Sequence, residues 1–138
     1  MSLNMKKIIT TITILTAGME AHVDERTLYE FADKCMTCHE TYKENKMAPP
    51  LVAINQVYLR LNDNNMSKAM EKMKAFLAAP DENKTLMKPA VKLFGVMPNL
   101  DLNSTEIEDM SQVLIETEFD IPDWFEEHYK SHDLNKTE

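Results

Sequence analysis

The chain has 138 residues and a formal net charge of −8, with 23 acidic residues against 15 basic ones. An acidic chain of this length is expected to form one small domain, and its charge disfavours nucleic acid and anionic membrane surfaces as partners. Its only two cysteines, Cys35 and Cys38, belong to one short motif, so none is left for a structural disulfide or a second metal-binding pair.

The first 21 residues have the pattern of a secretory leader. Residues 1–4 resemble a cloning remnant, residues 5–7 are basic, and residues 8–17 are apolar and rich in threonine. An apolar run of that length is too short to cross a bilayer as a stable helix. We therefore expect cleavage after Ala21 and export to a bacterial periplasm. An uncleaved anchor is the alternative, and only then would the protein contact the membrane.

The next segment, residues 27–39, is predicted to form a helix that carries the most informative motif of the chain. Thr27 and Glu30 have the spacing of a capping box, and apolar residues then recur at helical intervals. The helix ends in CMTCH, where Cys35, Cys38 and His39 have the spacing by which haem is covalently attached. Two thiols three positions apart on a helical turn point the same way, so both can add to one porphyrin while the imidazole reaches its iron.

Other uses of a Cys-x-x-Cys pair fit the sequence less well. A thioredoxin-like redox site needs a βαβ setting, and no alternating apolar strands flank this motif. A structural zinc site needs a second pair of ligands. His128 and His132 have the spacing of such a pair on a helix but lie about 90 residues further along the chain. Because a third ligand is missing there, we expect these two histidines to be solvated.

The middle of the chain is predicted to be helical between prolines. Pro49 and Pro50 must end any helix that follows the motif. Residues 54–61 form one expected helix, and residues 67–79 form a better one that Pro80 stops. Methionines at helical spacing usually fill a core, so we expect the stripe on the second helix to be structural: Met66, Met70, Met73, Phe76 and Leu77.

A loop after a short helical turn over residues 89–93 is predicted to present Met97. Gly95 lies two residues before this methionine, and Pro98 follows it directly. A residue before proline is held extended. A stiff, extended backbone is what presenting a thioether to a metal from a loop requires.

Two further helices are expected near the end of the chain. The last long helix should begin at Ser104 or Thr105, with a capping box that pairs Thr105 with Glu108. Residues 122–138 form an expected extension, with a short aromatic helix begun by Asp123 and a polar tail. We expect its aromatic residues to pack back on the domain, although an interaction arm is the alternative.

Together these elements resemble class I c-type cytochromes. The likeness covers residues 26–117: a helix ending in CMTCH, a proline-containing loop, a Met-Pro pair in a later loop, and a C-terminal helix. It implies an all-α, cytochrome c-like fold over residues 22–121. The N- and C-terminal helices would then pack around one covalently attached haem c, and residues 122–138 would be an appended helix.

The resemblance also implies residue roles. In the family the two cysteines form thioethers, and the motif histidine and a loop methionine bind the iron. Here these would be Cys35, Cys38, His39 and Met97. The family uses a proline carbonyl to accept the imidazole N–H, which implies Pro49 or Pro50 for that role.

The expected function is electron transfer. His/Met ligation leaves no open position on the iron, so we expect a non-enzymatic, periplasmic carrier of single electrons without a small-molecule substrate. Lys6, Lys7 and Glu20 contribute +1 in total, so residues 22–138 carry −9, and a redox protein with a basic docking face is the natural partner. Two alternatives are a haem-based sensor or gas-binding module, in which Met97 does not bind, and a subunit of a larger periplasmic oxidoreductase.

Overall fold

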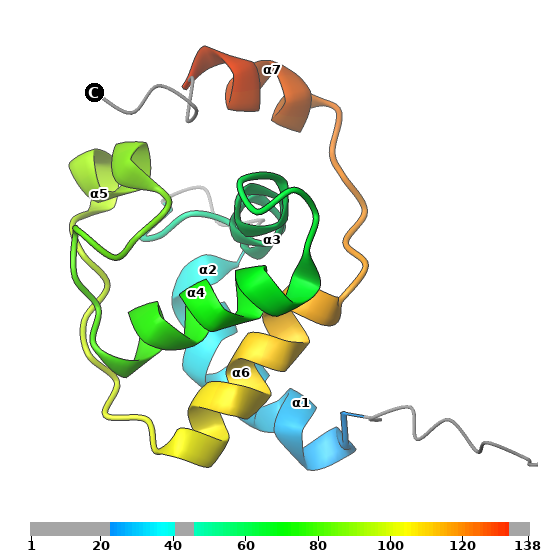
Figure 1. Cartoon of the computed structure of the whole chain (residues 1–138), viewed down its shortest axis with the longest axis vertical. Helices are drawn as coiled ribbons and strands as arrows, with labels where there is room; N and C mark the ends of the chain where they lie inside the picture. Colours follow the sequence, from blue (N-terminus) through cyan, green and yellow to red (C-terminus); the bar gives the residue numbers. More distant parts are fainter. Residues whose placement is uncertain (1–22, 41–45, 133–138) are drawn as a thin grey trace, which may run out of the picture.

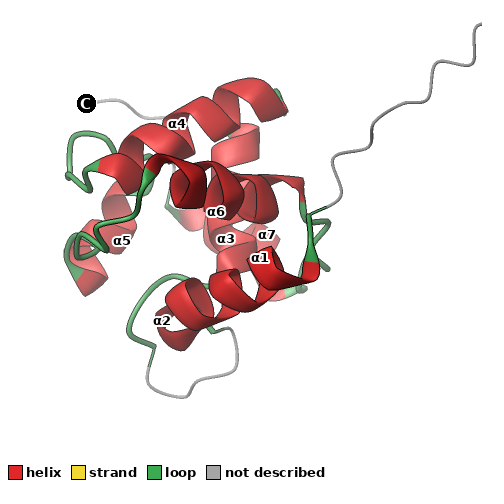
Figure 2. Cartoon of the chain, turned by 90° about the horizontal axis from the view of Figure 1, so that it is seen from below, coloured by secondary structure: helices red, strands yellow, loops and turns green. Residues whose placement is uncertain are grey.

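The computed structural model describes residues 23–40 and 46–132, and within these ranges the protein contains helices and no strand (Figures 1 and 2). The predicted all-α class is therefore confirmed for this part of the chain. The expected leader over residues 1–21 lies outside the described residues. The helices are α1 (Glu25–Phe31), η1 (Ala32–Met36), α2 (Thr37–His39), α3 (Leu51–Arg60), α4 (Met66–Ala78), α5 (Lys88–Phe94), α6 (Ser104–Glu116) and α7 (Trp124–Ser131).

The first three helical segments follow one another without a break, because the residues at their junctions keep right-handed helical backbone angles. The helix begins after Asp24, whose carboxylate accepts a hydrogen bond from the backbone N–H of Thr27 at 2.8 Å. The expected capping box of Thr27 and Glu30 is wrong. Asp24 caps the helix three residues earlier, and Glu30 instead pairs with Arg26 at 3.0 Å.

Helix α3 begins three residues before the predicted start at residue 54. Pro50 precedes its first turn in an extended conformation, and the Pro50 carbonyl accepts hydrogen bonds from the N–H groups of Ala53 and Ile54. A proline is tolerated there because the first N–H groups of a helix have no intrahelical partner. The preceding helix α2 already ends at His39, with Glu40 extended, so Pro49 and Pro50 do not end it, and Pro50 instead starts the next helix.

Helices α4 and α6 cross and form the centre of the molecule together with α1 and α3 (Figure 1). On α4, Met73 is buried and Met70 is half-buried, as the expected core stripe requires, whereas Met66 is 46% exposed. The cap of α6 differs from the prediction, because Asn103 and Glu106 form the capping box. The buried cluster contains Phe31, Leu51, Ile54, Tyr58, Ala69, Met73, Met110, Val113, Leu114 and Ile115.

A buried asparagine joins α3 to the end of α6. The side-chain amide of Asn55, which is 1% exposed, donates hydrogen bonds to the carbonyls of Leu114, Ile115 and Thr117 at 2.9, 3.2 and 3.4 Å. The last carbonyls of a helix have no intrahelical donor. Asn55 therefore supplies donors at a helix end that is packed inside the protein.

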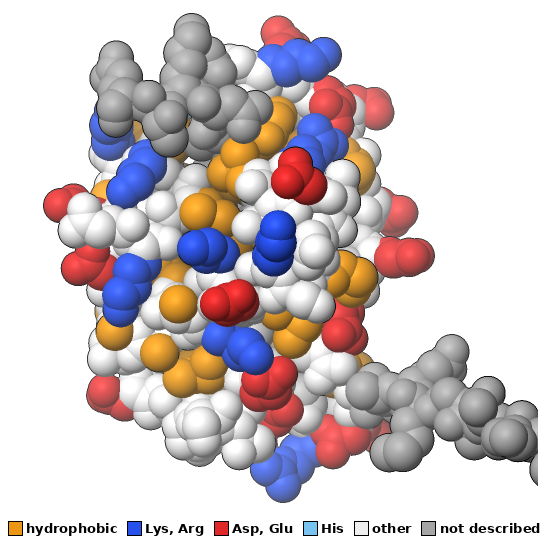
Figure 3. Space-filling view, in the orientation of Figure 1, with side chains coloured by type: hydrophobic (Ala, Val, Ile, Leu, Met, Phe, Trp, Pro, Cys, Tyr) orange, Lys and Arg blue, Asp and Glu red, His pale blue; other side chains and the backbone are white. Residues whose placement is uncertain are grey.

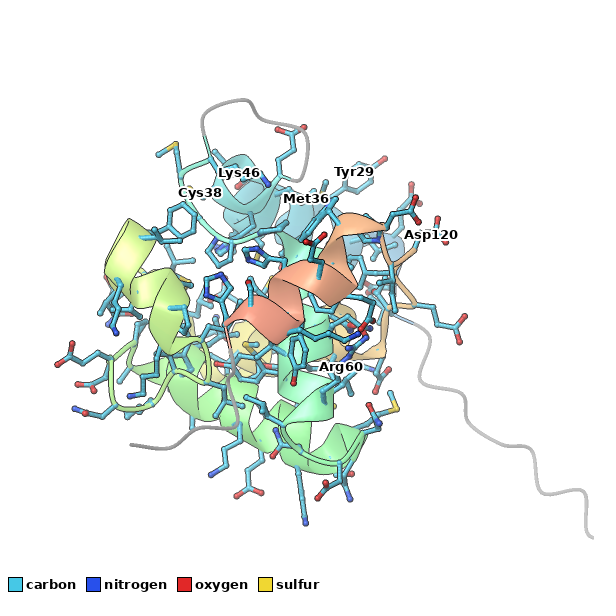
Figure 4. All side chains as sticks on the ribbon, turned by 90° about the horizontal axis from the view of Figure 1, so that it is seen from above. Tyr29, Met36, Cys38, Lys46, Arg60 and Asp120 are labelled. Atoms are coloured by element: carbon cyan, nitrogen blue, oxygen red, sulfur yellow. The ribbon has the colours of Figure 1, made fainter. Side chains whose placement is uncertain are left out.

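The C-terminal helix α7 lies against α3, as Figure 4 shows from the side of α7. Phe125 is 1% exposed, which confirms for this residue that the extension packs back on the domain. Trp124 is 41% exposed, so this second aromatic residue packs on the domain only in part. Arg60 of α3 forms a bidentate ion pair with Glu126 and stacks over the rings of Phe125 and Tyr129.

Candidate functional site

A cavity of about 260 Å³ opens between the first helical segments, α3, α4, α5 and α6. Its walls are mainly apolar, and none of the described residues that line it is acidic. Each of the four residues expected to hold a haem lines it, although they come from two segments about sixty residues apart in the sequence: Cys35, Cys38, His39 and Met97. The fold thus brings the motif and the methionine loop to one cavity.

His39 lines this cavity and is held by a backbone carbonyl. Its Nδ1 lies 2.7 Å from the carbonyl oxygen of Pro49. Since a carbonyl oxygen only accepts hydrogen bonds, Nδ1 carries the proton and donates, and Nε2 keeps its lone pair. Burial lowers the pKa of His39 and the bond to Pro49 opposes that shift, so the imidazole is neutral at pH 7. Of the two candidate acceptors, Pro49 makes the bond, while Pro50 caps α3.

The two cysteines have different surroundings. Cys35 is half-buried, its Sγ lies 3.9 Å from Sδ of Met110, and burial raises the pKa of its thiol to about 11. Cys38 is exposed at the edge of the same cavity. Cys35 belongs to the π-helical segment η1, a wider turn that the sequence did not predict. Such turns inside α-helices are frequent at functional sites.

Met97 reaches the cavity from a loop whose path depends on Gly95. The φ angle of Gly95 is 79°, a left-handed value that side chains other than hydrogen disfavour. Met97 itself is half-buried. The cavity is rich in thioethers, which also come from Met47, Met73, Met87 and Met110. Position in a loop distinguishes Met97 from Met73 and Met110, which are almost fully buried on regular helices.

Three polar residues at this cavity were not anticipated. Tyr58 is 2% exposed; burial raises the pKa of its phenol, while hydrogen bonds to the Leu86 backbone and the Thr85 side chain oppose the shift. Lys34 lines another part of the wall and pairs with Glu106 at 3.3 Å. Tyr58, Thr85 and Lys34 have no characteristic spacing in the sequence. Their common position on the cavity wall therefore becomes visible only in the fold.

Comparisons with protein families, with curated proteins and with solved structures find no match to this chain. Within residues 23–40 and 46–132, no three or more His, Cys, Asp or Glu side chains gather in a way that could hold a metal ion. His128 and His132 do lie together, with ring centroids 4.4 Å apart. No helix in the described part of the chain is long and apolar enough to span a bilayer.

Proposed function

We propose that this protein is a monohaem c-type cytochrome that carries single electrons between redox proteins and catalyses no reaction of its own. The observation that carries the proposal is the shared cavity of Cys35, Cys38, His39 and Met97, together with the 2.7 Å contact of His39 Nδ1 with the Pro49 carbonyl. When bound, haem c would supply one-electron redox chemistry at its iron.

The donor set suits that cofactor. Cys35 and Cys38 line the cavity and offer two thiols for thioether bonds, and their spacing would let both add to one porphyrin. His39 offers a neutral Nε2, because Pro49 fixes the proton on Nδ1. A carbonyl partner of this kind orients an imidazole ligand and raises its basicity. Met97 offers a soft thioether, and this ligand pair favours reduced iron and a raised potential.

The walls of the cavity suit a macrocycle. They are mainly apolar, and an apolar surrounding excludes water and lowers the local dielectric. The cavity of about 260 Å³ is close to the lower end of the range for organic ligands, roughly 300–1,000 Å³, and its open mouth leaves further room. Lys34 and Tyr58 also line the cavity and would offer a positive charge and a hydroxyl to the polar groups of a bound haem.

The arrangement of helices also supports the proposal at the level of the fold. The helix that bears the motif packs on α6, the last long helix, as the N- and C-terminal helices of a cytochrome c-like fold would. A periplasmic location follows from the same proposal together with the leader-like residues 1–21. The proposed partners are redox proteins with basic docking faces, since the chain carries −8. Figure 3 shows basic side chains among the acidic ones on one face, so the acidic excess is not concentrated on that face.

Covalent attachment is the first test. The full chain, produced with residues 1–21 in a bacterium that matures c-type cytochromes, should retain haem after denaturation and acid-acetone extraction. Its pyridine haemochrome spectrum should have the position typical of two thioether bonds. Cys35→Ala or Cys38→Ala should shift that spectrum and reduce retention, whereas Ser67→Ala, at an exposed position of α4, is a control without effect. Complete loss of haem from the unsubstituted chain would refute the proposal.

Met97 decides between an electron carrier and a sensor. Met97→Ala should abolish the far-red charge-transfer band of ferric thioether-ligated haem, lower the reduction potential, and open the iron to carbon monoxide. Met66→Ala is the matched control, because Met66 is 46% exposed and does not line the cavity. Rapid binding of carbon monoxide by the unsubstituted protein, or an unchanged potential in Met97→Ala, would favour the sensor instead.

A further inference from the structure

A second cavity, of about 300 Å³, lies between α7 on one side and α3 and α5 on the other. Figure 4 shows α7 crossing above α3 with α5 beside it. The cavity shares only part of its wall with the candidate haem site, through Pro49, Met87, Ala90 and Phe94. Cys35, Cys38, His39 and Met97 do not line it, so the cavity calls for a separate explanation.

Nitrogen donors converge on this cavity. Lys46, His128 and His132 line it, and Tyr129 adds a phenol. The rings of His128 and His132 meet edge to face with centroids 4.4 Å apart, and the Lys46 ammonium lies 5.4 Å from the centre of the Trp124 ring. Burial lowers the pKa of His128, and the charges of His132 and Lys46 lower it further. The field that Lys46 and His132 create at His128 is therefore positive.

The remaining walls are apolar and partly flat. Phe94, Trp124 and Phe125 contribute aromatic rings, and three proline rings face the same space: Pro49, Pro50 and Pro89. Flat apolar walls of this kind favour a planar apolar body. At about 300 Å³ the cavity is at the small end of ligand pockets, so its occupant should be small.

We infer that this cavity binds a small monocarboxylic acid with a flat apolar body, whose carboxylate meets Lys46, His128 and His132 and whose ring lies among Trp124, Phe94 and the prolines. None of the described residues that line the cavity is acidic, although the chain has 23 acidic residues against 15 basic ones. An anion bound in this cavity would therefore contact nitrogen donors, and no carboxylate among the described lining residues would compete with it for them. Charged hydrogen bonds to such an anion are about twice as strong as neutral ones.

Binding to the purified full chain can be measured directly by titration calorimetry, with benzoate as the probe. Trp124 is the only tryptophan of the chain, so its fluorescence reports on the same cavity. Benzoate should bind with 1:1 stoichiometry, benzamide of the same shape should bind about three- to tenfold more weakly, and benzylamine more weakly still. Hexanoate tests whether a flat ring is required, and the inference expects it to bind less tightly than benzoate.

Variants locate the site. Lys46→Met and His128→Gln should each weaken benzoate binding about three- to tenfold and leave benzamide binding unchanged. Lys92→Met is the matched control, because Lys92 is exposed on α5 but does not line the cavity. Failure to bind benzoate, equal affinity for benzoate and benzamide, tighter binding of hexanoate, or unchanged affinity in both cavity variants would overturn the inference. None of these measurements depends on haem. Their outcome therefore neither supports nor refutes the proposed electron-carrier function.

Discussion

Asn55 offers a test of how the protein holds together the two sides of the candidate haem cavity, which is the cavity that residues of the CMTCH motif line. It lies on α3, whose Leu51, Ile54 and Tyr58 line that cavity, and it donates hydrogen bonds to the end of α6. Asn55→Leu keeps a similar volume but removes the donors. The buried carbonyls at the end of α6 then have no partner from α3.

The expected loss follows from the contacts that disappear. Two hydrogen bonds of 2.9 and 3.2 Å are the main contributors, and each stabilises a protein by about 1 kcal/mol net. Leaving buried carbonyls unsatisfied adds to that cost, so the free energy of unfolding should fall by about 2–4 kcal/mol. For a domain near 100 residues, each kcal/mol corresponds to roughly 4–8 °C in melting temperature, which gives a fall of roughly 8–30 °C.

Thermal and urea unfolding, followed by circular dichroism, measure this change. Asn83→Leu is the control, because Asn83 is an exposed turn residue, and that variant should stay within about 0.5 kcal/mol of the unsubstituted protein. Asn55→Asp should be worse than Asn55→Leu at neutral pH, since an ionised carboxylate would face the same carbonyl oxygens. If Asn55→Leu melted within 2 °C of the unsubstituted protein, the amide would not cap α6 as argued.

Three further predictions concern other parts of the fold. In haem-free protein iodoacetamide should modify exposed Cys38 before Cys35, and the Cys35 rate should rise about tenfold per pH unit towards its pKa of about 11; equal rates by mass spectrometry at pH 8 would contradict this. Ser111→Ala should raise the free energy of unfolding by about 1 kcal/mol, because this buried hydroxyl has no hydrogen-bond partner among the described residues, and a loss in urea unfolding would count against it. Arg60→Met should speed hydrogen exchange in α7, since Arg60 pairs with Glu126, and unchanged exchange there would show that the pair does not hold the helix.

Much of the helical pattern could be predicted because it rests on local signals. The spacing of apolar residues predicts α4 and α6 to within one or two residues, and the predicted stop at Pro80 follows from backbone restriction. The residues that cap the helices were harder to predict than the helices themselves. Thr27 and Thr105 each have a glutamate three residues later, yet Asp24 and Asn103 cap the helices instead. Asp and Asn are at least as good as Thr at this position, so the local pattern alone did not separate the candidates.

The buried polar residues could not be predicted, because long-range packing creates their roles. In the sequence, Asn55 looks like an ordinary polar residue on a helix. The carbonyls to which it donates hydrogen bonds lie about 60 residues further along the chain. Ser111 is a polar residue that would be expected on the surface of α6, but the fold buries it fully. Similarly, the π-helical turn around Cys35 has no recognised signature in the sequence. Tertiary contacts override local preference at such positions.

The choice of Met97 over Met73 and Met110 depends on what the backbone at each position allows. Met73 and Met110 lie on regular helices within the packed core, and the Met110 sulfur already contacts Cys35. Moving either sulfur toward a ligand would open space in that core, which costs free energy. Met97 is only half-buried, in a loop that turns at Gly95, so its thioether can adjust without disturbing a helix. If Met97 binds haem iron as proposed, the same looseness would make it an easily displaced ligand, and this one residue would then govern both electron transfer and access of small gases to the iron.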